Sequence, residues 1–262
     1  MKILVCVKQV PGSNNVEVDP VTGVLKRSGI PSKINPYDLY ALETALTLAE
    51  RFGGTVHTLT MGPPQAQTVI RETICMGAVN GTVLTDRKFA GADVLATAYT
   101  ISQGIAKSGP YDLIICGKQT TDGDTAQVGA EVAEYLGIPN ISNVLSVEDV
   151  AEGKLYATTN LDNRIVSLSI SLPCLISVDG DINTPRLPSY KIRKTLTDEA
   201  VSFLTFADFQ DQNPDHYGLS GSATQVERIF PPEKTTQKQV LEGDADALAQ
   251  SLFGLLQDQK RV

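Results

Sequence analysis

The first 140 residues alternate between two sequence patterns, and this alternation constrains the fold more than any other feature. Four short apolar runs, rich in β-branched residues, are separated by segments whose apolar side chains recur every three or four positions. Such alternation is typical of βαβ units, and strands that helices cover on both faces are almost continuously apolar. We therefore expect a doubly wound α/β fold with strands over residues 2–7, 55–61, 79–84 and 111–116.

Three helices are expected between these strands. The first begins at Asn35, has Pro36 at its first position and ends at Gly53, because proline favours the first helical position and glycine the residue after the last. The second lies between Pro-Pro and glycine punctuation over residues 63–77, and the third covers about residues 93–107. These helices would connect parallel strands of one sheet.

The pattern changes after about residue 139, where strands follow one another without long helices. The expected strands cover residues 141–147, 154–161, 165–170 and 174–178. In the third of these, apolar residues alternate with more polar ones, which predicts one buried and one exposed face. We expect a small antiparallel flap on a mainly parallel sheet. A hairpin is also expected over residues 16–26, around the turn sequence DPVTG.

Two regions are expected along the chain. Residues 1–187 form the nucleotide-binding α/β core with its flap, and residues 188–262 form a C-terminal arm that embraces a partner. The arm is rich in Pro, Lys, Gln and Asp and lacks strong periodicity before residue 245. Its apolar side chains need a surface to cover them. They are Phe203, Leu204, Phe206, Phe209, Ile229 and Phe230.

Composition narrows the possible functions. A net charge of −8 and a sequence pI near 4.8 argue against a nucleic-acid partner, since phosphate backbones are bound mainly by clustered Lys and Arg. No apolar run approaches the ~20 residues that cross a bilayer, so we expect a cytoplasmic protein without membrane insertion. The four cysteines form no CxxC pair and only two histidines exist, so no metal site is expected.

The most informative segment covers residues 117–129, which follow a buried strand and open another helix. Asp124 or Thr125 could cap that helix, with Gln127 as the reciprocal residue of a capping box. The N–H groups of its first turn would then form an anion site. A plain polar loop before a capped helix explains the same residues, and both interpretations stay open here. The strand ends at Cys6–Pro11 and Thr60–Pro64 should lie beside this loop.

Standard phosphate motifs are absent from the sequence. Neither GxxxxGKS, GxxxxGKT nor GxGxxG occurs, which disfavours a P-loop NTPase and an ordinary Rossmann dehydrogenase. An ATP-binding regulatory module remains an alternative, because it could share a βαβ core and a phosphate site at a helix start.

Several motifs together resemble the β subunits of electron-transfer flavoproteins. They are VCVKQVP at 5–11, INPYD at 34–38, MGPP at 61–64, GKQ at 117–119, DGDTAQVG at 122–129 and NTPR at 183–186. The resemblance runs in order over about residues 1–190. The DGDTAQVG and NPYD variants, and GLSGSATQVERIF at 218–230, resemble the electron-bifurcating branch.

The resemblance implies a site for FAD, with AMP as the alternative. Asp122, Gly123, Thr125, Gln127 and Val128 would hold the diphosphate and ribose. Around the adenine and adjoining groups would lie Cys6, Lys8, Asn35, Asp38, Met61, Gly62 and Cys116. Because the cofactor itself performs hydride and one-electron chemistry, no catalytic side chain is expected.

The resemblance also implies partners. NADH would reduce the FAD, and electrons would leave singly to ferredoxin or flavodoxin and, through the FAD of an α subunit, to a flavin-containing dehydrogenase of the acyl-CoA or 2-hydroxy-acid type. Leu187, Tyr190 and Ile192 lie where relatives carry a loop that recognises the dehydrogenase. Residues 187–194 differ from the mitochondrial pattern, so the resemblance does not identify the dehydrogenase. The chain would be an electron-transfer subunit, and not an enzyme on its own.

Overall fold

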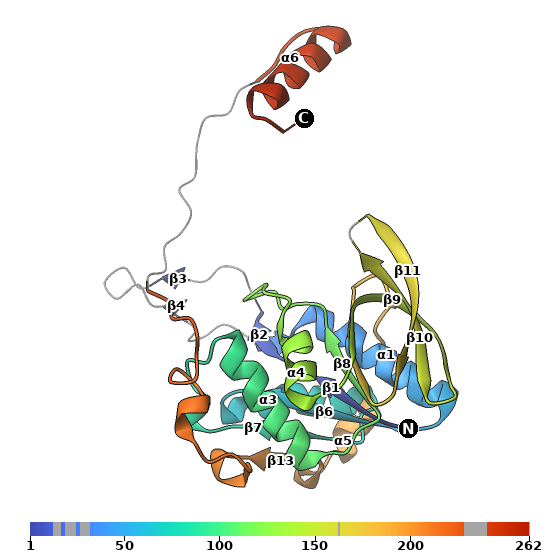
Figure 1. Ribbon diagram of the computed structural model, residues 1–262, viewed down its shortest axis with the longest axis vertical. Helices are drawn as coiled ribbons and strands as arrows, with labels where there is room; N and C mark the ends of the chain where they lie inside the picture. The colour runs from blue at the N-terminus through green and yellow to red at the C-terminus, as the bar shows by residue number, and fades with distance from the viewer. Residues whose placement is uncertain (13–16, 19–24, 27–31, 162, 228–239, 262) are drawn as a thin grey trace. The chain divides into compact units, whose positions relative to one another are not determined.

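The protein is described by a computed structural model covering residues 1–12, 17–18, 25–26, 32–161, 163–227 and 240–261. Its main sheet has the strand order β11-β10-β9-β12-β8-β1-β6-β7-β13 (Figure 1). The strands of this sheet are β1 (Lys2–Cys6), β6 (Thr55–Met61), β7 (Asn80–Leu84), β8 (Leu113–Gly117), β9 (Asn140–Ala151), β10 (Lys154–Leu161), β11 (Arg164–Ser171), β12 (Cys174–Val178) and β13 (Val201–Leu204). Seven neighbouring strands, from β9 to β13 in the sheet order, run parallel. The expected doubly wound α/β fold is confirmed.

Helices cover both faces of the parallel part. The helices of the first unit are α1 (Pro36–Phe52), α2 (Gln67–Met76), α3 (Val94–Ser108), α4 (Val128–Leu136) and α5 (Tyr190–Thr195). One buried cluster joins α1 and α2 to the sheet, and a second joins α3 and α4 to its other face. The three predicted helices before residue 110 are thus confirmed. Gly53 and Gly77 follow the ends of α1 and α2, both with positive φ.

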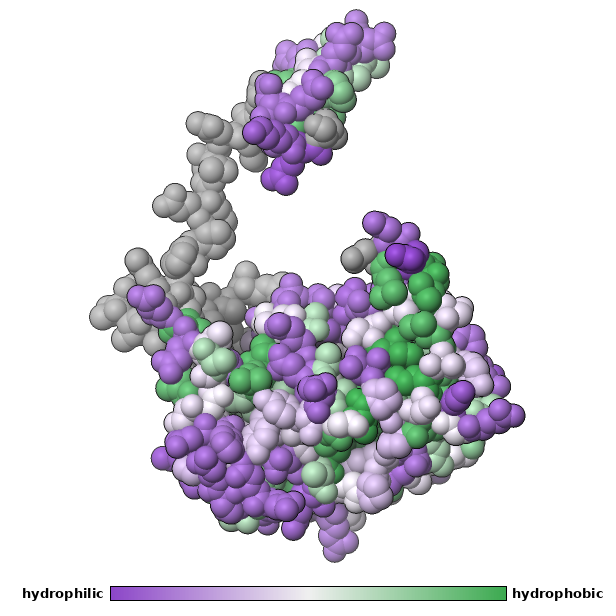
Figure 2. All heavy atoms as spheres, in the orientation of Figure 1, coloured by the Kyte–Doolittle hydropathy of each residue, from purple (hydrophilic) through white to green (hydrophobic). Residues whose placement is uncertain are grey.

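The predicted flap is present as antiparallel strands β10 and β11, which extend the main sheet through the long strand β9. Its last strand differs from the expectation. On the apolar side of β11, Ile170 is buried, but Val166 is only half-buried and Leu168 is 39% exposed. Figure 2 shows apolar side chains gathered on the surface over this end of the sheet. Apolar and polar residues do alternate along β11, but β11 is an edge strand. The described residues cover its apolar side only at the end near Ile170.

Residues beyond 187 contribute to the first compact unit, which extends from Met1 to Glu227. β13 pairs with β7 at the edge of the main sheet. Phe206 and Phe209 are buried in the same cluster as Tyr217, so the expectation that these two phenylalanines need a partner surface is wrong. Phe203 stays 45% exposed. Ile229 and Phe230 lie outside the described residues.

The second unit begins at Arg228 and contains α6 (Ala245–Asp258), on which Leu252 and Phe253 are each more than half exposed. Two small sheets complete the structure. β2 (Gln9–Pro11) pairs with β5 (Ser32–Ile34), and β3 (Glu17–Val18) pairs with β4 (Leu25–Lys26). The β3–β4 pairing confirms the predicted hairpin, although its turn at 19–24 lies outside the described residues. Among the described helices, none has the length and apolarity that crossing a membrane requires.

Candidate functional site

The order of the strands defines a switch point between β1 and β8. From β1 the chain adds β6 and β7 on one side, then returns to add β8 on the other side. The connections that leave β1 and β8 therefore diverge, and ligands of open α/β sheets bind in the crevice that such a divergence forms outside the carboxyl ends of the strands. The loop at 118–127 and the β1 exit at Lys8 both lie at this edge.

Asn35 and Asp38 join the exits of both strands. The backbone N–H of Lys8 donates to Asp38 Oδ2 over 2.7 Å, and Asn35 Nδ2 donates to Asp38 Oδ1 over 2.9 Å. Asn35 Nδ2 also donates to the carbonyl of Gln119 over 2.8 Å, and Asn35 Oδ1 accepts from Thr121 N over 3.2 Å. The start of α1 thus contacts both the β1 exit and a loop that lies more than 80 residues after Asn35 in the sequence.

Asp38 is buried against backbone. Burial raises the pKa of its carboxyl to about 7, although hydrogen bonds from Asn35, Lys8 and Gly117 lower it. Gly117 is required at the end of β8, because a Cβ there would lie 2.5 Å from Asp38 Oδ1 and 2.6 Å from the carbonyl carbon of Tyr37. A buried carboxyl whose pKa lies near neutrality marks a candidate functional site.

Lys8 connects the β1 exit to the loop after β8. Its Nζ lies 2.8 Å from Asp122 Oδ1. Burial raises the pKa of Asp122, but hydrogen bonding and charge from Lys8 outweigh this and hold it below its ordinary value. Within the loop, Gln119 Nε2 donates to Asp124 Oδ1 over 2.5 Å. The Lys8 side chain, 45% exposed, is therefore ion-paired with Asp122 at the carboxyl ends of β1 and β8.

The start of α4 corrects one prediction. The helix begins at Val128 with Gln127 as its N-cap, and Gln127 makes no side-chain cap hydrogen bond. Neither Asp124 nor Thr125 caps it, because the chain is still turning there: Asp124 and Ala126 have φ of 54° and 57°. With no side-chain cap, the first-turn N–H groups of α4 suit an anion, and alternating left- and right-handed backbone forms anion-binding concavities. The start of α4 is therefore a candidate anion site.

The remaining predicted site residues are distributed along the same edge. Cys6 and Cys116 are register partners on β1 and β8, and the Cys6 thiol together with burial raises the pKa of Cys116. Met61 ends β6, and Gly62 donates its N–H to Leu84 O over 3.0 Å. Among the described contacts, no hydrogen bond joins residues 61–62 to the loop at 118–127. Thr125 and Gln127 are exposed.

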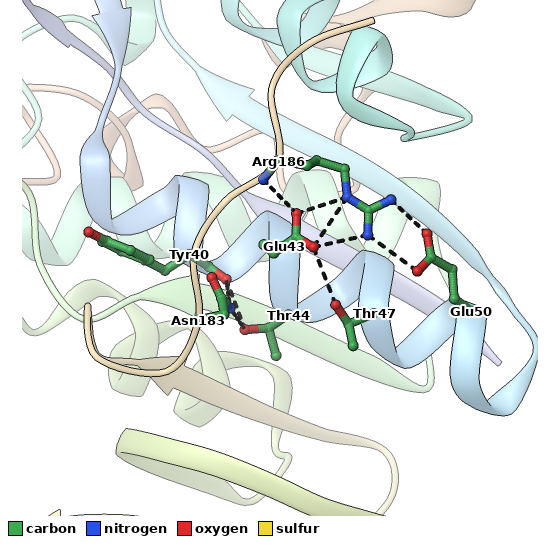
Figure 3. A network of polar contacts seen from close by, with 7 residues as sticks. All are labelled: Tyr40, Glu43, Thr44, Thr47, Glu50, Asn183 and Arg186. Carbon is green, nitrogen blue, oxygen red and sulfur yellow. Dashed lines mark hydrogen bonds and ion pairs between the residues drawn. The ribbon is translucent and has the colours of Figure 1, made fainter.

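Two polar connections near the site were not predicted. Lys118 Nζ lies 2.9 Å from Asp179 Oδ2, which ties the β8 exit to the β12 exit. Arg186 contacts Glu43 and Glu50 on α1, with Nε 2.9 Å from Glu43 Oε2 and one terminal nitrogen 2.6 Å from Glu50 Oε1 (Figure 3). The seven-residue spacing of the two glutamates places them on one face of α1, which is the signal that the sequence offered.

Asn183 also joins the segment that carries Arg186 to α1. Its Nδ2 donates to Tyr40 O over 3.0 Å and to Thr44 Oγ1 over 2.8 Å (Figure 3). The chain after residue 186 is then exposed, with Leu187 at 89% and Tyr190 at 71% exposure, while Ile192 is 36% exposed. Tyr190 lines a hollow together with Cys75, Pro188 and Arg193. No group of His, Cys, Asp and Glu side chains that could hold a metal ion occurs among the described residues.

Comparison with known proteins agrees with this architecture. The family model described as "Electron transfer flavoprotein domain" matches residues 22–204. The chain is 41% identical over 253 residues to "Electron transfer flavoprotein subunit beta" of Thermoanaerobacterium thermosaccharolyticum, covering 96% of each chain. It is 40% identical over 259 residues to "Protein FixA" of Bradyrhizobium diazoefficiens, covering 97% of this chain and 90% of the relative.

A third relative carries a more specific name. The chain is 37% identical over 260 residues, and 98% of each chain, to "Caffeyl-CoA reductase-Etf complex subunit CarD" of Acetobacterium woodii. The family match and these near full-length similarities agree with the motifs that the sequence carries at the strand ends. The chain therefore belongs to the electron-transfer flavoprotein β-subunit family.

Proposed function

We propose that this chain binds FAD at the carboxyl ends of β1 and β8 and serves as the β subunit of an electron-bifurcating flavoprotein. The observation that carries the proposal is the network of Lys8, Asn35, Asp38 and Asp122 at the switch point, beside the uncapped start of α4. This edge of the sheet suits a phosphate-bearing ligand, because the edge offers backbone N–H groups and one exposed lysine.

In this proposal the chain positions the ligand and tunes its surroundings. Lys8 and the first turn of α4 receive the diphosphate, while residues at the ends of β1, β6 and β8 surround the adenine. Bound FAD would supply hydride acceptance from NADH and one-electron delivery to ferredoxin or flavodoxin and to the α-subunit flavin. The name of the CarD relative, which places that protein in a reductase–Etf complex, supports the bifurcating branch.

Partner contacts form the second part of the proposal. The β-subunit family supports pairing with an α subunit. Leu187, Tyr190 and Ile192 would meet a flavin-containing dehydrogenase. Of the expected arm over residues 188–262, the part beyond the first compact unit would embrace the α subunit in the cytoplasm. The exposed apolar residues Leu252 and Phe253 of α6 suit such a role.

The site is tested by Lys8→Gln in the full chain co-expressed with its α subunit. Losing one charge-assisted contact to a phosphate should speed the release of bound FAD or AMP about tenfold. Lys154→Gln, at an exposed lysine of β10, is the matched control. Equal release rates from the two variants would refute the assignment of the phosphate site to this edge.

A further inference from the structure

Asn35 differs from the other predicted site residues because its side chain is completely buried. Both hydrogens of its amide are used, one toward Asp38 Oδ1 and one toward Gln119 O, and its oxygen accepts from Thr121 N. Its own backbone N–H donates to Lys8 O over 2.9 Å. The residue thus contacts the β1 exit, the start of α1 and the loop after β8, and its polar atoms are directed toward protein.

The position of Asn35 makes this use of the amide informative. Asparagine at a helix N-cap ordinarily accepts from an N–H of the first turn. Asn35 is the N-cap residue of α1, yet it makes no such side-chain bond. Its amide instead spans 84 residues of sequence to Gln119 and 86 to Thr121. The Asn35 amide therefore does not cap α1, and its hydrogen bonds hold the loop after β8 instead.

We propose that Asn35 is a positioning residue: it holds Gln119–Thr121 against the start of α1 and so sets the conformation of the nucleotide-binding loop at 118–127. This inference deepens the proposed function and rests on it for the identity of the ligand. Asn35 acts through the loop and does not need to touch the nucleotide.

The neighbouring contacts explain why one side chain can have this effect. Thr121 immediately precedes Asp122, which is ion-paired with Lys8. Residues 120 and 124 are joined by a backbone hydrogen bond of 3.0 Å. Fixing Gln119 and Thr121 therefore fixes the base of the turn that leads to the N–H groups of α4. Without Asn35, the carbonyl of Gln119 and the N–H of Thr121 would lose their partly buried hydrogen bonds. The buried Asp38 Oδ1 would lose a donor as well, and a buried polar group is costly to leave unpaired.

The test compares Asn35→Ala with Asn183→Ala. Asn183 is a matched control because its amide also makes two hydrogen bonds to α1, to Tyr40 O and Thr44 Oγ1, and none to the loop. Amide hydrogen exchange is measured on the ligand-free full chain, and FAD and AMP release on the complex with the α subunit. Asn35→Ala should speed exchange at residues 119–124 and nucleotide release, each about tenfold relative to Asn183→Ala.

The two measurements separate the possible failures. Equal exchange at residues 119–124 in both variants would overturn the positioning role, whatever the ligand. Faster exchange in Asn35→Ala with a wild-type complex that holds neither FAD nor AMP would keep the positioning role and overturn the proposed function.

Discussion

Asp38 and Arg186 show how single side chains organise this edge of the sheet. Asp38 combines burial with hydrogen bonds to three backbone or amide N–H groups, and burial prevails in raising its pKa. Arg186 does the reverse for Glu43: burial raises the pKa of Glu43, but hydrogen bonds from Arg186 hold it below its ordinary value. Each of these two carboxyl groups gives a test on the full chain.

The first test concerns Asp38 and pH. Its pKa is about 7 in the folded chain and ordinarily 3.8, so between pH 4 and 7 the folded state holds a proton that the unfolded state has lost. The contribution of Asp38 to the free energy of unfolding therefore falls as pH rises through this window. Asp38→Asn cannot ionise, so its stability relative to the wild type should rise with pH by at most roughly 4 kcal/mol. Urea denaturation at several pH values measures this; a pH-independent difference would contradict a protonated Asp38.

The second test concerns Arg186. Arg186→Ala should lower the free energy of unfolding by about 1–3 kcal/mol, because Glu43 would remain buried without its partner. The control is Arg71→Ala. Arg186 and Arg71 are equally exposed, but the Asp198 partner of Arg71 is 94% exposed and the Glu43 side chain only 11%, so the control should lose much less. Equal losses in urea denaturation would show that the burial of Glu43 does not matter.

The sequence predicted the residues at the strand ends but not the contacts of Arg186. Lys8, Asn35, Asp38 and Asp122 were named through family resemblance, and the structure brings all four together. Their pairing was not readable from periodicity, because the contacts span from 3 to 114 residues. The Arg186 network was not predicted, because the sequence indicates only the shared helix face of Glu43 and Glu50, and their partner lies 143 residues after Glu43.

At the scale of elements, predictions succeeded where local chemistry decides the structure. Pro36 and Gly53 correctly bounded α1, and continuous apolar runs identified the central strands. The predicted cap of α4 is wrong because the loop before the helix engages the expected capping residue. Asp124 has the sequence position of a helix cap, but its carboxylate is occupied by Gln119 and its φ is positive. Local spacing could not show this competition.

The cap of α3 makes an element-scale prediction. Asp93 accepts from Ala96 N at the start of α3, and its other oxygen accepts from the backbone and side chain of Thr224 over 2.8 and 2.9 Å. Asp93→Ala should lower stability by roughly 1 kcal/mol and speed proteolysis within residues 218–227. Asp244→Ala removes the corresponding cap of α6 and should leave that segment protected. Similar proteolysis in both variants would contradict a holding role for Asp93.

At the scale of the whole molecule, the first unit has two buried apolar clusters, and other apolar side chains stay exposed on the surface. The buried positions of Phe206 and Phe209 show that part of the C-terminal region completes the first unit. Sequence alone could not show this, because their covering residues include Phe89 and Tyr99, more than 100 residues away. The apolar groups of β11 and α6 remain exposed, and a complex with an α subunit is where we expect them to be covered.

We propose that the strand-end site of this chain holds FAD. The decisive measurement is the identity and stoichiometry of the nucleotides that mild acid releases from the purified complex of this chain with its α subunit, separated by chromatography. We expect two FAD per heterodimer, one of them lost selectively from the Lys8→Gln variant. One FAD with one AMP would contradict bifurcation and leave a simple electron carrier, and ATP without flavin would contradict the proposed function as a whole.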